Sequence, residues 1–376
     1  MAERAAPTRA LSAHELRRYS RHLLMPEVAL AGQERLSRSR ALVVGAGGLG
    51  SPALQYLAAA GVGRIGIVDD DVVDETNLQR QTIFSAEDVG KPKASVAAER
   101  LRAINPFVAP DAIGVRFDES NARALVALYD VVLDCTDRFP TRYLVNDACV
   151  LEGRPDVYGS IFRFDGQVSV FSRERPCYRC LYPEPPPAGS VPTCAEGGVL
   201  GVLAGIVGSW QASEALKLLL GIGEPLTGRL MLIDALGAKT REVRFERDPE
   251  CVLCGDRARL RDAREMRYED ETSSETEEVA ASEVDDVLGE WTLLDVREPH
   301  EVVLGIVPGS VNIPASRLEE RLHELDSSQR YLVACRVGQK SRWAAQRLRD
   351  AGFAHVRHLH GGLLAYAAHH EGFGIF

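Results

Sequence analysis

The 376-residue sequence lacks several features that would place it in a specialised class. Its most apolar run, 199–210, is shorter than the roughly 20 residues that a membrane-spanning helix needs. Residues 1–21 contain no apolar core, so they are not a secretory signal. The net charge is −10 with no basic stripe to offset it, which argues against nucleic-acid binding driven by counterion release. Eight cysteines are too few for a disulfide-stapled scaffold. We therefore expect a cytoplasmic enzyme whose cysteines serve metal binding or catalysis.

The chain is long enough for two or three domains, each with its own core. The amino-acid composition of the chain changes after Cys254. Six of the ten positions from Glu269 to Glu278 are acidic, and the segment before them has almost no large apolar residues. Such a segment cannot bury enough apolar area to offset its ordering entropy. The sequence therefore predicts domains at 1–255 and 279–376, joined by an acidic flexible linker at 256–278.

Short β-rich runs alternate with helical segments in both parts. In the first part, helices are expected at 12–24 (capped by Ser12 and Glu15), after the glycines to about residue 60, and at 92–104. Strands are expected at 40–45, 64–69, 113–117, 131–134, 156–160, 166–171, 229–234 and 241–246. This alternation predicts an α/β fold with a doubly wound, mostly parallel sheet. Residues 279–376 repeat the pattern and predict a second, smaller α/β domain.

A glycine-rich turn follows the first strand and opens a helix, with glycines at Gly45, Gly47, Gly48 and Gly50. Glycines let the backbone approach a phosphate closely, and the helix N-terminus offers free N–H groups. Asp69 ends the second strand, where a carboxylate can accept hydrogen bonds from ribose hydroxyls. The pattern predicts a Rossmann-like nucleotide site, and on its own it fits NAD as well as ATP.

The next segment favours ATP. Asn77, Arg80 and Gln81 follow Asp69 closely, and Lys93 comes soon after. Hydride transfer does not require two cations near the phosphates, whereas nucleotidyl transfer does, because charge develops on phosphate oxygens. The alternatives that remain open are an NAD-dependent oxidoreductase, and solvated surface cations at Arg80 and Lys93.

Residues 12–254 resemble the bacterial sulfur-carrier branch of the ubiquitin-activating-enzyme superfamily, the ThiF- and MoeB-type adenylyltransferases. The matching strings include RYSRHLLMPE, VVGAGGLGSPALQYLAAAGVG, NLQRQ, DCTDRFPTRYLVND and CYRCLYP. The resemblance implies that Gly47 and its neighbours line the ATP phosphates and that Asp69 holds the ribose. It implies that Asn77, Arg80 and Lys93 contact the triphosphate, and that Asp137 positions Mg²⁺ and the reacting carboxylate. Arg21 resembles an arginine that the family's dimers insert into the neighbouring site, which implies a homodimer.

Two CxxC pairs lie in the first part, at Cys177 and Cys180 and at Cys251 and Cys254. Two such turns can complete a tetrahedral zinc site with no open position, which is a structural site. The resembled family also binds zinc there, so one structural Zn²⁺ per subunit is expected. The alternatives are a redox CxxC and four free buried thiols.

Cys194 precedes the apolar helix, where a thiolate is favoured. In the resembled family this segment crosses over the adenylate site. Its cysteine matches one that forms a thioester in ubiquitin activation, which implies a catalytic thiol. A small loop residue without a catalytic role is the competing interpretation.

Cys335 lies on a strand-to-helix turn in the second part, with Arg336 and Lys340 beside it. Backbone N–H groups and the helix dipole at such a turn stabilise an anionic sulfur. The loop resembles that of rhodanese sulfurtransferases, as do DVREPHE and PGSVNIP, and Asp295 and Arg297 resemble that family's structural pair. A cysteine phosphatase would have Arg where Ser341 stands. A rhodanese fold used only for docking also stays open.

Together the two parts resemble fused adenylyltransferase–sulfurtransferases. The resemblance implies that ATP activates the C-terminal Gly-Gly carboxylate of a ubiquitin-like sulfur-carrier protein. A persulfide on Cys335 would then convert it to a thiocarboxylate. The sulfur donor would be a cysteine desulfurase or thiosulfate.

Overall fold

The computed structural model describes residues 10–186, 197–260, 277–303 and 305–370. The chain divides into two compact units, one within residues 10–260 and the other from 277 onward. Most of the expected linker lies outside the described residues, and so does Cys194 in an earlier segment. Within the described residues, no helix has the length and apolarity needed to cross a membrane.

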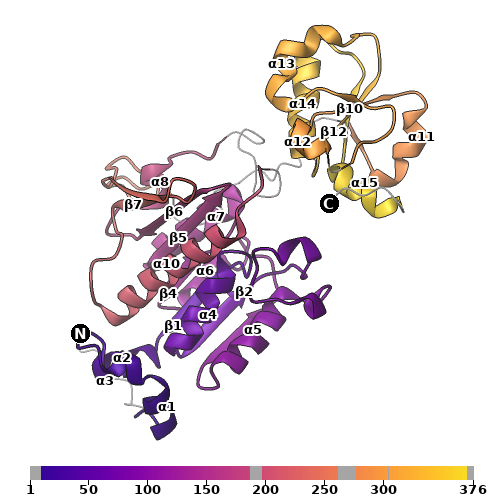
Figure 1. Cartoon of the computed structure of the whole chain (residues 1–376). Coiled ribbons are helices and arrows are strands. Elements are labelled where there is room, and N and C mark those ends of the chain that lie inside the picture. The colour runs from indigo at the N-terminus through magenta and orange to yellow at the C-terminus, as the bar shows by residue number, and fades with distance from the viewer. Residues whose placement is uncertain (1–9, 187–196, 261–276, 304, 371–376) are drawn as a thin grey trace. The chain divides into compact units, whose positions relative to one another are not determined.

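The first unit is built on an eight-stranded sheet in the order β3-β2-β1-β4-β5-β6-β7-β8 (Figure 1). The strands are β1 Arg40–Val44, β2 Arg64–Val68, β3 Ala109–Ile113, β4 Val131–Asp134, β5 Asp156–Phe162, β6 Asp165–Phe171, β7 Arg229–Asp234 and β8 Lys239–Arg244. The helices are α1 Ala13–Arg18, α2 Ser20–Leu23, α3 Ala29–Leu36, α4 Gly50–Ala60, α5 Lys93–Ile104, α6 Ala122–Ala127, α7 Phe139–Glu152, α8 Tyr178–Leu181 and α10 Gly201–Leu220.

The sheet is parallel from β3 to β5 and antiparallel from β5 to β8. The parallel half is doubly wound, as expected. Alternate residues of β1 face opposite layers: Ala41 and Val43 pack with α4, α5 and α10, and Leu42 and Val44 pack with α6 and α7. This alternation is the period of a strand buried on both faces.

Several boundaries shift by about two residues, as in β5 and β8, and two elements differ more from the sequence expectation. The third strand runs over Ala109–Ile113 rather than 113–117, and it lies at the sheet edge, where Pro110 costs no ladder hydrogen bond. The expected helix 12–24 is two helices that meet at Tyr19. Its N-terminal capping box is present: Glu15 N donates to Ser12 Oγ, and Ser12 N donates to Glu15 Oε2.

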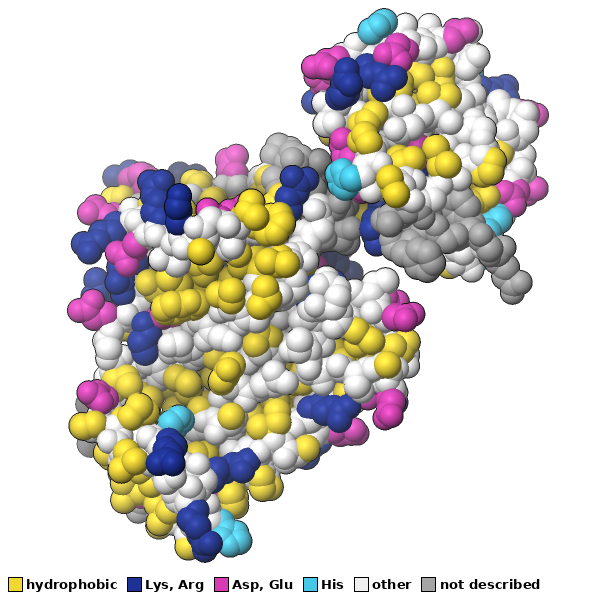
Figure 2. Space-filling model, viewed as in Figure 1, with side chains coloured by type: hydrophobic (Ala, Val, Ile, Leu, Met, Phe, Trp, Pro, Cys, Tyr) yellow, Lys and Arg dark blue, Asp and Glu magenta, His cyan; other side chains and the backbone are white. Residues whose placement is uncertain are grey.

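Helix α10 leaves part of its apolar surface uncovered in this unit. Val202, Ile206 and Trp210 are spaced four residues apart and lie 63%, 39% and 41% exposed. This spacing places them along one stripe of the helix. Figure 2 shows hydrophobic side chains gathered over this region of the first unit.

The second unit is a five-stranded parallel sheet in the order β11-β10-β12-β13-β9. Its strands are β9 Glu278–Val279, β10 Thr292–Asp295, β11 Val311–Asn312, β12 Tyr331–Ala334 and β13 Val356–Leu359. Its helices are α11 Val284–Leu288, α12 Pro299–Val302, α13 Leu318–Arg321, α14 Gln339–Asp350 and α15 Gly362–His369. Helix α14 packs on one face of this sheet, and α15 packs on the other.

Candidate active sites and metal centre

The glycine turn joins β1 to α4 at the carboxyl edge of the parallel strands. Gly45 has φ +94°, and a Cβ there would lie 2.8 Å from the carbonyl oxygen of Cys135, so this position requires glycine. Helix α4 begins beyond it without a side-chain cap. In its first turn Ser51 N donates to Gly47 O at 2.9 Å, and anion binding at this turn stays a prediction.

Asp69 organises this turn from the end of β2. Its Oδ2 accepts a hydrogen bond from Ala46 N at 2.7 Å, and its Oδ1 accepts one from Asp71 N at 3.0 Å. Burial raises the pKa of Asp69 above its ordinary value. The carboxylate thus holds the backbone of the phosphate turn, a contact that the sequence pattern did not reveal.

The segment from Asn77 to Gln81 packs against the same turn. A Cβ at Gly48 would lie 3.4 Å from Arg80 Cγ, and one at Gly47 would lie 3.6 Å from Gln81 Nε2. Gln81 is buried, and its Oε1 has no hydrogen-bond partner among the described residues. Asn77 Oδ1 accepts from Asp74 N. The structure therefore brings Arg80 and Gln81 to the glycine turn, and Asn77 stays in the preceding turn.

Lys93 is a buried cation at the start of α5. Its side chain is 7% exposed, and its Nζ lies 3.0 Å from Asp71 Oδ2, whose own side chain is 70% exposed. A partner this accessible can exchange for a phosphate oxygen at low cost. Lys93 is thus held in the neighbourhood of Asp69 and the glycine turn.

A buried carboxylate, Asp134, ends β4, and an exposed one follows three residues later. Asp137 is the exposed carboxylate, and its role in positioning Mg²⁺ stays a prediction. Asp134 is fully buried, and its Oδ1 accepts hydrogen bonds from Thr136 N at 3.0 Å and from Thr136 Oγ1 at 2.6 Å. Its Oδ2 has no hydrogen-bond partner among the described residues. The Asp134 side chain therefore shapes the turn that presents Asp137.

Two more buried charged groups, Asp156 and Arg142, lie near Asp134. Burial and the nearby charge of Asp134 raise the pKa of Asp156 well above its ordinary value. Burial likewise raises the pKa of Asp134, and the Arg142 guanidinium opposes that shift. Strand β4 pairs with β5, and this pairing brings Asp134 and Asp156 together from separate segments of the chain. No local motif signals such a cluster.

The four paired cysteines converge, as predicted. Their Sγ atoms all lie within 4.8 Å of one another. The separations are 3.6 Å for Cys177–Cys251, 3.3 Å for Cys180–Cys254 and 3.8 Å for Cys177–Cys180. Four thiolates at the usual Zn–S bond length of about 2.3 Å lie about 3.8 Å apart at tetrahedral angles. The cluster is compatible with structural zinc.

A buried ion pair supports the first CxxC turn. Arg179 donates from Nε and Nη2 to the two carboxylate oxygens of Asp147 on α7, both at 2.8 Å. The side chains are 3% and 1% exposed. Tyr178 N donates to Asn146 Oδ1, also at 2.8 Å. These bonds fix α8 against α7 and so fix the two cysteines that flank Arg179.

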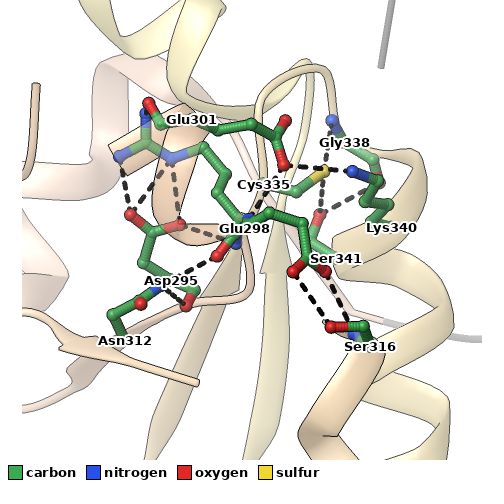
Figure 3. Close-up of polar contacts among 10 residues, drawn as sticks. Asp295, Glu298, Glu301, Asn312, Ser316, Cys335, Gly338, Lys340 and Ser341 are labelled. Atoms are coloured by element: carbon green, nitrogen blue, oxygen red, sulfur yellow. Dashed lines mark hydrogen bonds and ion pairs between the residues drawn. The ribbon is translucent and has the colours of Figure 1, made fainter. Parts of the chain in front are cut away.

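In the second unit, Cys335 follows β12 and is fully buried. Its Sγ accepts a hydrogen bond from Gly338 N at 3.1 Å and lies 3.6 Å from Ser341 Oγ (Figure 3). Gly338 has φ +95° immediately before α14, so the loop turns its N–H inward where a side chain would be strained. The loop thus offers a hydrogen-bond donor to an anionic sulfur, as the sequence predicts.

Asp295 and Arg297 form the structural pair that the resemblance implies. Arg297 Nη2 lies 2.6 Å from Asp295 Oδ2, and both side chains are buried. Lys340, expected to add positive charge beside the thiol, is instead ion-paired with Glu301 at 3.2 Å. No local sequence signal links Glu301 to Lys340, because the two residues are 39 positions apart.

Residues 19–253 match the ThiF family, and residues 280–369 match the rhodanese-like domain. The first match covers more than half of the chain. The chain belongs to the ThiF family. It carries a rhodanese-like domain after the ThiF region, so the first unit is a nucleotide-binding adenylyltransferase fold and the second is a sulfurtransferase fold.

Full-length relatives combine both parts. The probable adenylyltransferase/sulfurtransferase MoeZ of Mycobacterium tuberculosis is 45% identical over 372 residues, which cover 96% of this chain and 95% of that protein. The adenylyltransferase and sulfurtransferase MOCS3 of Arabidopsis thaliana is 40% identical, over 95% and 84% respectively. The chain is an adenylyltransferase and sulfurtransferase, and these findings overturn the oxidoreductase alternative.

The first unit has relatives of its own. A sulfur carrier protein adenylyltransferase of Thermus thermophilus is 56% identical over 248 residues, which cover 64% of this chain and 92% of that protein. The crystal structure of Escherichia coli MccB matches with a TM-score of 0.58 at 24% identity, over 67% of this chain and 75% of that one. The MccB likeness shows the fold alone.

Proposed function

We propose that this chain adenylylates the C-terminal carboxylate of a ubiquitin-like sulfur-carrier protein and then converts it to a thiocarboxylate. One observation carries the proposal: a single chain holds a glycine turn against which Arg80 packs and a cysteine whose sulfur accepts a backbone N–H. The names of two relatives, a sulfur carrier protein adenylyltransferase and a SAMP-activating enzyme E1, support a carrier of this kind.

In the first step, a carboxylate oxygen of the carrier attacks the α-phosphorus of ATP, and the bond to pyrophosphate breaks. Arg80 and Lys93 neutralise the charge that develops on the phosphate oxygens. Asp137 is the exposed oxygen donor that would hold Mg²⁺, and that ion, when bound, would screen the triphosphate. The product is an acyl-adenylate.

In the second step, the terminal sulfur of a Cys335 persulfide attacks the activated carbonyl carbon. AMP leaves with the electron pair, and an acyl disulfide remains. A second thiol then attacks the Cys335 sulfur, which releases the thiocarboxylate and leaves a mixed disulfide for a thiol reductant to reduce. Cys194 is our candidate for the second thiol, and it lies outside the described residues.

We also propose a homodimer in which Arg21 enters the partner's site. Arg21 is exposed on α2, and the apolar stripe of α10 supplies surface that association would cover. Mixing inactive Arg21→Ala and Asp137→Ala proteins should restore adenylation to roughly a quarter of the wild-type rate, because half of the reassorted dimers are mixed and each regains one intact site. No recovery after verified subunit exchange contradicts the shared site.

The main test incubates the protein with ATP, Mg²⁺, a persulfide donor and a panel of carriers ending in Gly-Gly. Mass spectrometry should find one oxygen replaced by sulfur at the carrier C-terminus. Asp137→Ala should block adenylation, and Cys335→Ala should permit adenylation without sulfur transfer. Conversion of no carrier overturns the proposal. Full conversion by Cys335→Ala shows that the second unit serves only for docking.

The four cysteines are proposed to hold one structural Zn²⁺ per subunit, which would tie the second CxxC pair to the first across 74 positions. The measured metal content should be one zinc per chain. Cys251→Ser should lose it.

A further inference from the structure

Glu301 borders the Cys335 loop from a different segment of the second unit. Its Oε2 lies 3.2 Å from Lys340 Nζ and also accepts a hydrogen bond from Glu298 N at 2.8 Å. Its side chain is 7% exposed, and that of Lys340 is 20% exposed. The other carboxylate oxygen, Oε1, is buried and has no hydrogen-bond partner among the described residues. In Figure 3 the carboxylate of Glu301 and the amine of Lys340 are drawn on the same side of the loop as the Cys335 sulfur.

This arrangement sets the charge that an incoming sulfur donor meets. Arg336 and Lys340 are the two cations of the loop, and Glu301 compensates Lys340. Because both partners of the pair are largely buried, solvent and salt screen their fields only partly. A donor at the mouth of this loop therefore meets about one positive charge fewer than the sequence suggests.

Two classes of donor differ in the charge that they bring. With thiosulfate, the Cys335 thiolate attacks the outer sulfur, the S–S bond breaks, and sulfite leaves with the electron pair. With a persulfide, RS–S⁻, the thiolate attacks the terminal sulfur and RS⁻ leaves. Both reactions leave the same Cys335 persulfide. The first gathers three negative charges in the transition state, and the second gathers two.

We propose that Glu301 is a specificity-determining residue that selects singly charged persulfide donors over the thiosulfate dianion. The inference rests on the proposed function, and it names the donor class for Cys335. Glu301 acts through Lys340: it holds the ammonium in place and cancels its charge, so the site stabilises the more highly charged transition state less.

The test compares two donors on the full-length chain and needs neither ATP nor a carrier. Sulfur loading of Cys335 is followed with thiosulfate and with cysteine persulfide, whose carboxylate and ammonium cancel so that the ionised donor carries a single net negative charge. The kcat/KM is measured for each donor. Glu301→Gln retains an oxygen acceptor for Glu298 N and removes the charge. We expect the ratio of thiosulfate to persulfide efficiency to rise on the order of tenfold, as expected for one unit charge acting across a few partly screened ångströms.

Glu298→Gln is the matched control. Glu298 precedes the same helix, and its replacement changes the net charge by the same amount. Its carboxylate, however, accepts hydrogen bonds from Ser316 and does not pair with Lys340. Its ratio should change less than twofold. Glu301→Asp should keep the wild-type preference, and adding Lys340→Ala to Glu301→Gln should abolish the gain.

An unchanged ratio in Glu301→Gln, or an equal rise in Glu298→Gln, overturns the inference. Thermal unfolding of each variant separates a folding defect from a change in specificity. Lys340→Ala alone leaves the Glu301 charge uncompensated and should lower the ratio, so an unchanged ratio in that variant overturns the inference if Glu301→Gln does not fold. Failure here leaves carrier thiocarboxylation intact, since that reaction is scored separately with ATP and carrier present.

Discussion

The buried pair of Arg179 and Asp147 allows a quantitative prediction about the cysteine cluster. Replacing Asp147 with Leu leaves the Arg179 guanidinium buried without its counter-ion and removes two charge-assisted hydrogen bonds of 2.8 Å. Removing one partner of a buried ion pair costs about 3–5 kcal/mol. At about 2–4 °C per kcal/mol for a unit of this size, the first unit should melt roughly 10 °C lower. Because Arg179 lies between Cys177 and Cys180, metal should also be released sooner.

Differential scanning calorimetry of the full chain, with a colorimetric chelator to follow metal release, provides the assay. The transition of the second unit should not move, which makes it the internal control. The double variant Asp147→Leu with Arg179→Met should recover much of the lost stability, because no charge is then left buried. A loss below about 1 kcal/mol for the single variant, or a double variant no better than the single, would refute the reasoning.

Three further predictions follow from groups described above. Asp134→Ala should slow ATP–pyrophosphate exchange on the order of tenfold or more, because Thr136 loses its hydrogen-bond acceptor and the turn that presents Asp137 loosens. Asp134→Asn keeps an oxygen acceptor and should retain most of the activity. Equal losses in the two variants would show that these hydrogen bonds do not matter. Burial lowers the pKa of His358, so the unfolded chain takes up the proton at a higher pH than the folded chain does. The second unit should therefore lose stability as the pH falls below about 6.5. The urea midpoint measured from pH 7.5 to 5.5 checks this, and His358→Gln should reduce its dependence on pH. Prolonged chelation of the cysteine cluster should lower the melting temperature of the first unit and spare Cys335 sulfur loading, and a parallel loss of both would contradict separate units.

Local sequence signals sufficed where one short segment carries the chemistry. The glycine turn, the Cys335 loop and both CxxC pairs each have their essential atoms within a few residues, and the structure confirms their local geometry. The position of Asp69 at the end of β2 could also be predicted. Its bond to Ala46 N could not, because that bond depends on how the turn closes over the strand end.

Contacts between charged residues that are far apart in the chain could not be predicted from the sequence. Lys340 and Glu301 meet because β10 and β12 are adjacent in the second sheet, and neither residue's own segment indicates the other. Likewise, Asp134 and Asp156 come together through the β4–β5 ladder. A single sequence shows which residues are charged, and sheet order decides which charges cancel. The expected position of β3 was wrong for a related reason, since Pro110 is tolerated only because that strand is at an edge.

The wide spacing of the CxxC pairs also bears on how the protein is made. A ribosome adds roughly 5–20 residues per second, so Cys177 and Cys180 wait several seconds before their partners emerge. Helix α10 and strands β7 and β8 are synthesised in that interval. A metal bound by all four thiolates therefore closes the first unit only after its whole sheet has been translated. The second cysteine pair precedes the rhodanese-like domain in the chain, so the cluster can close while that domain is still being synthesised.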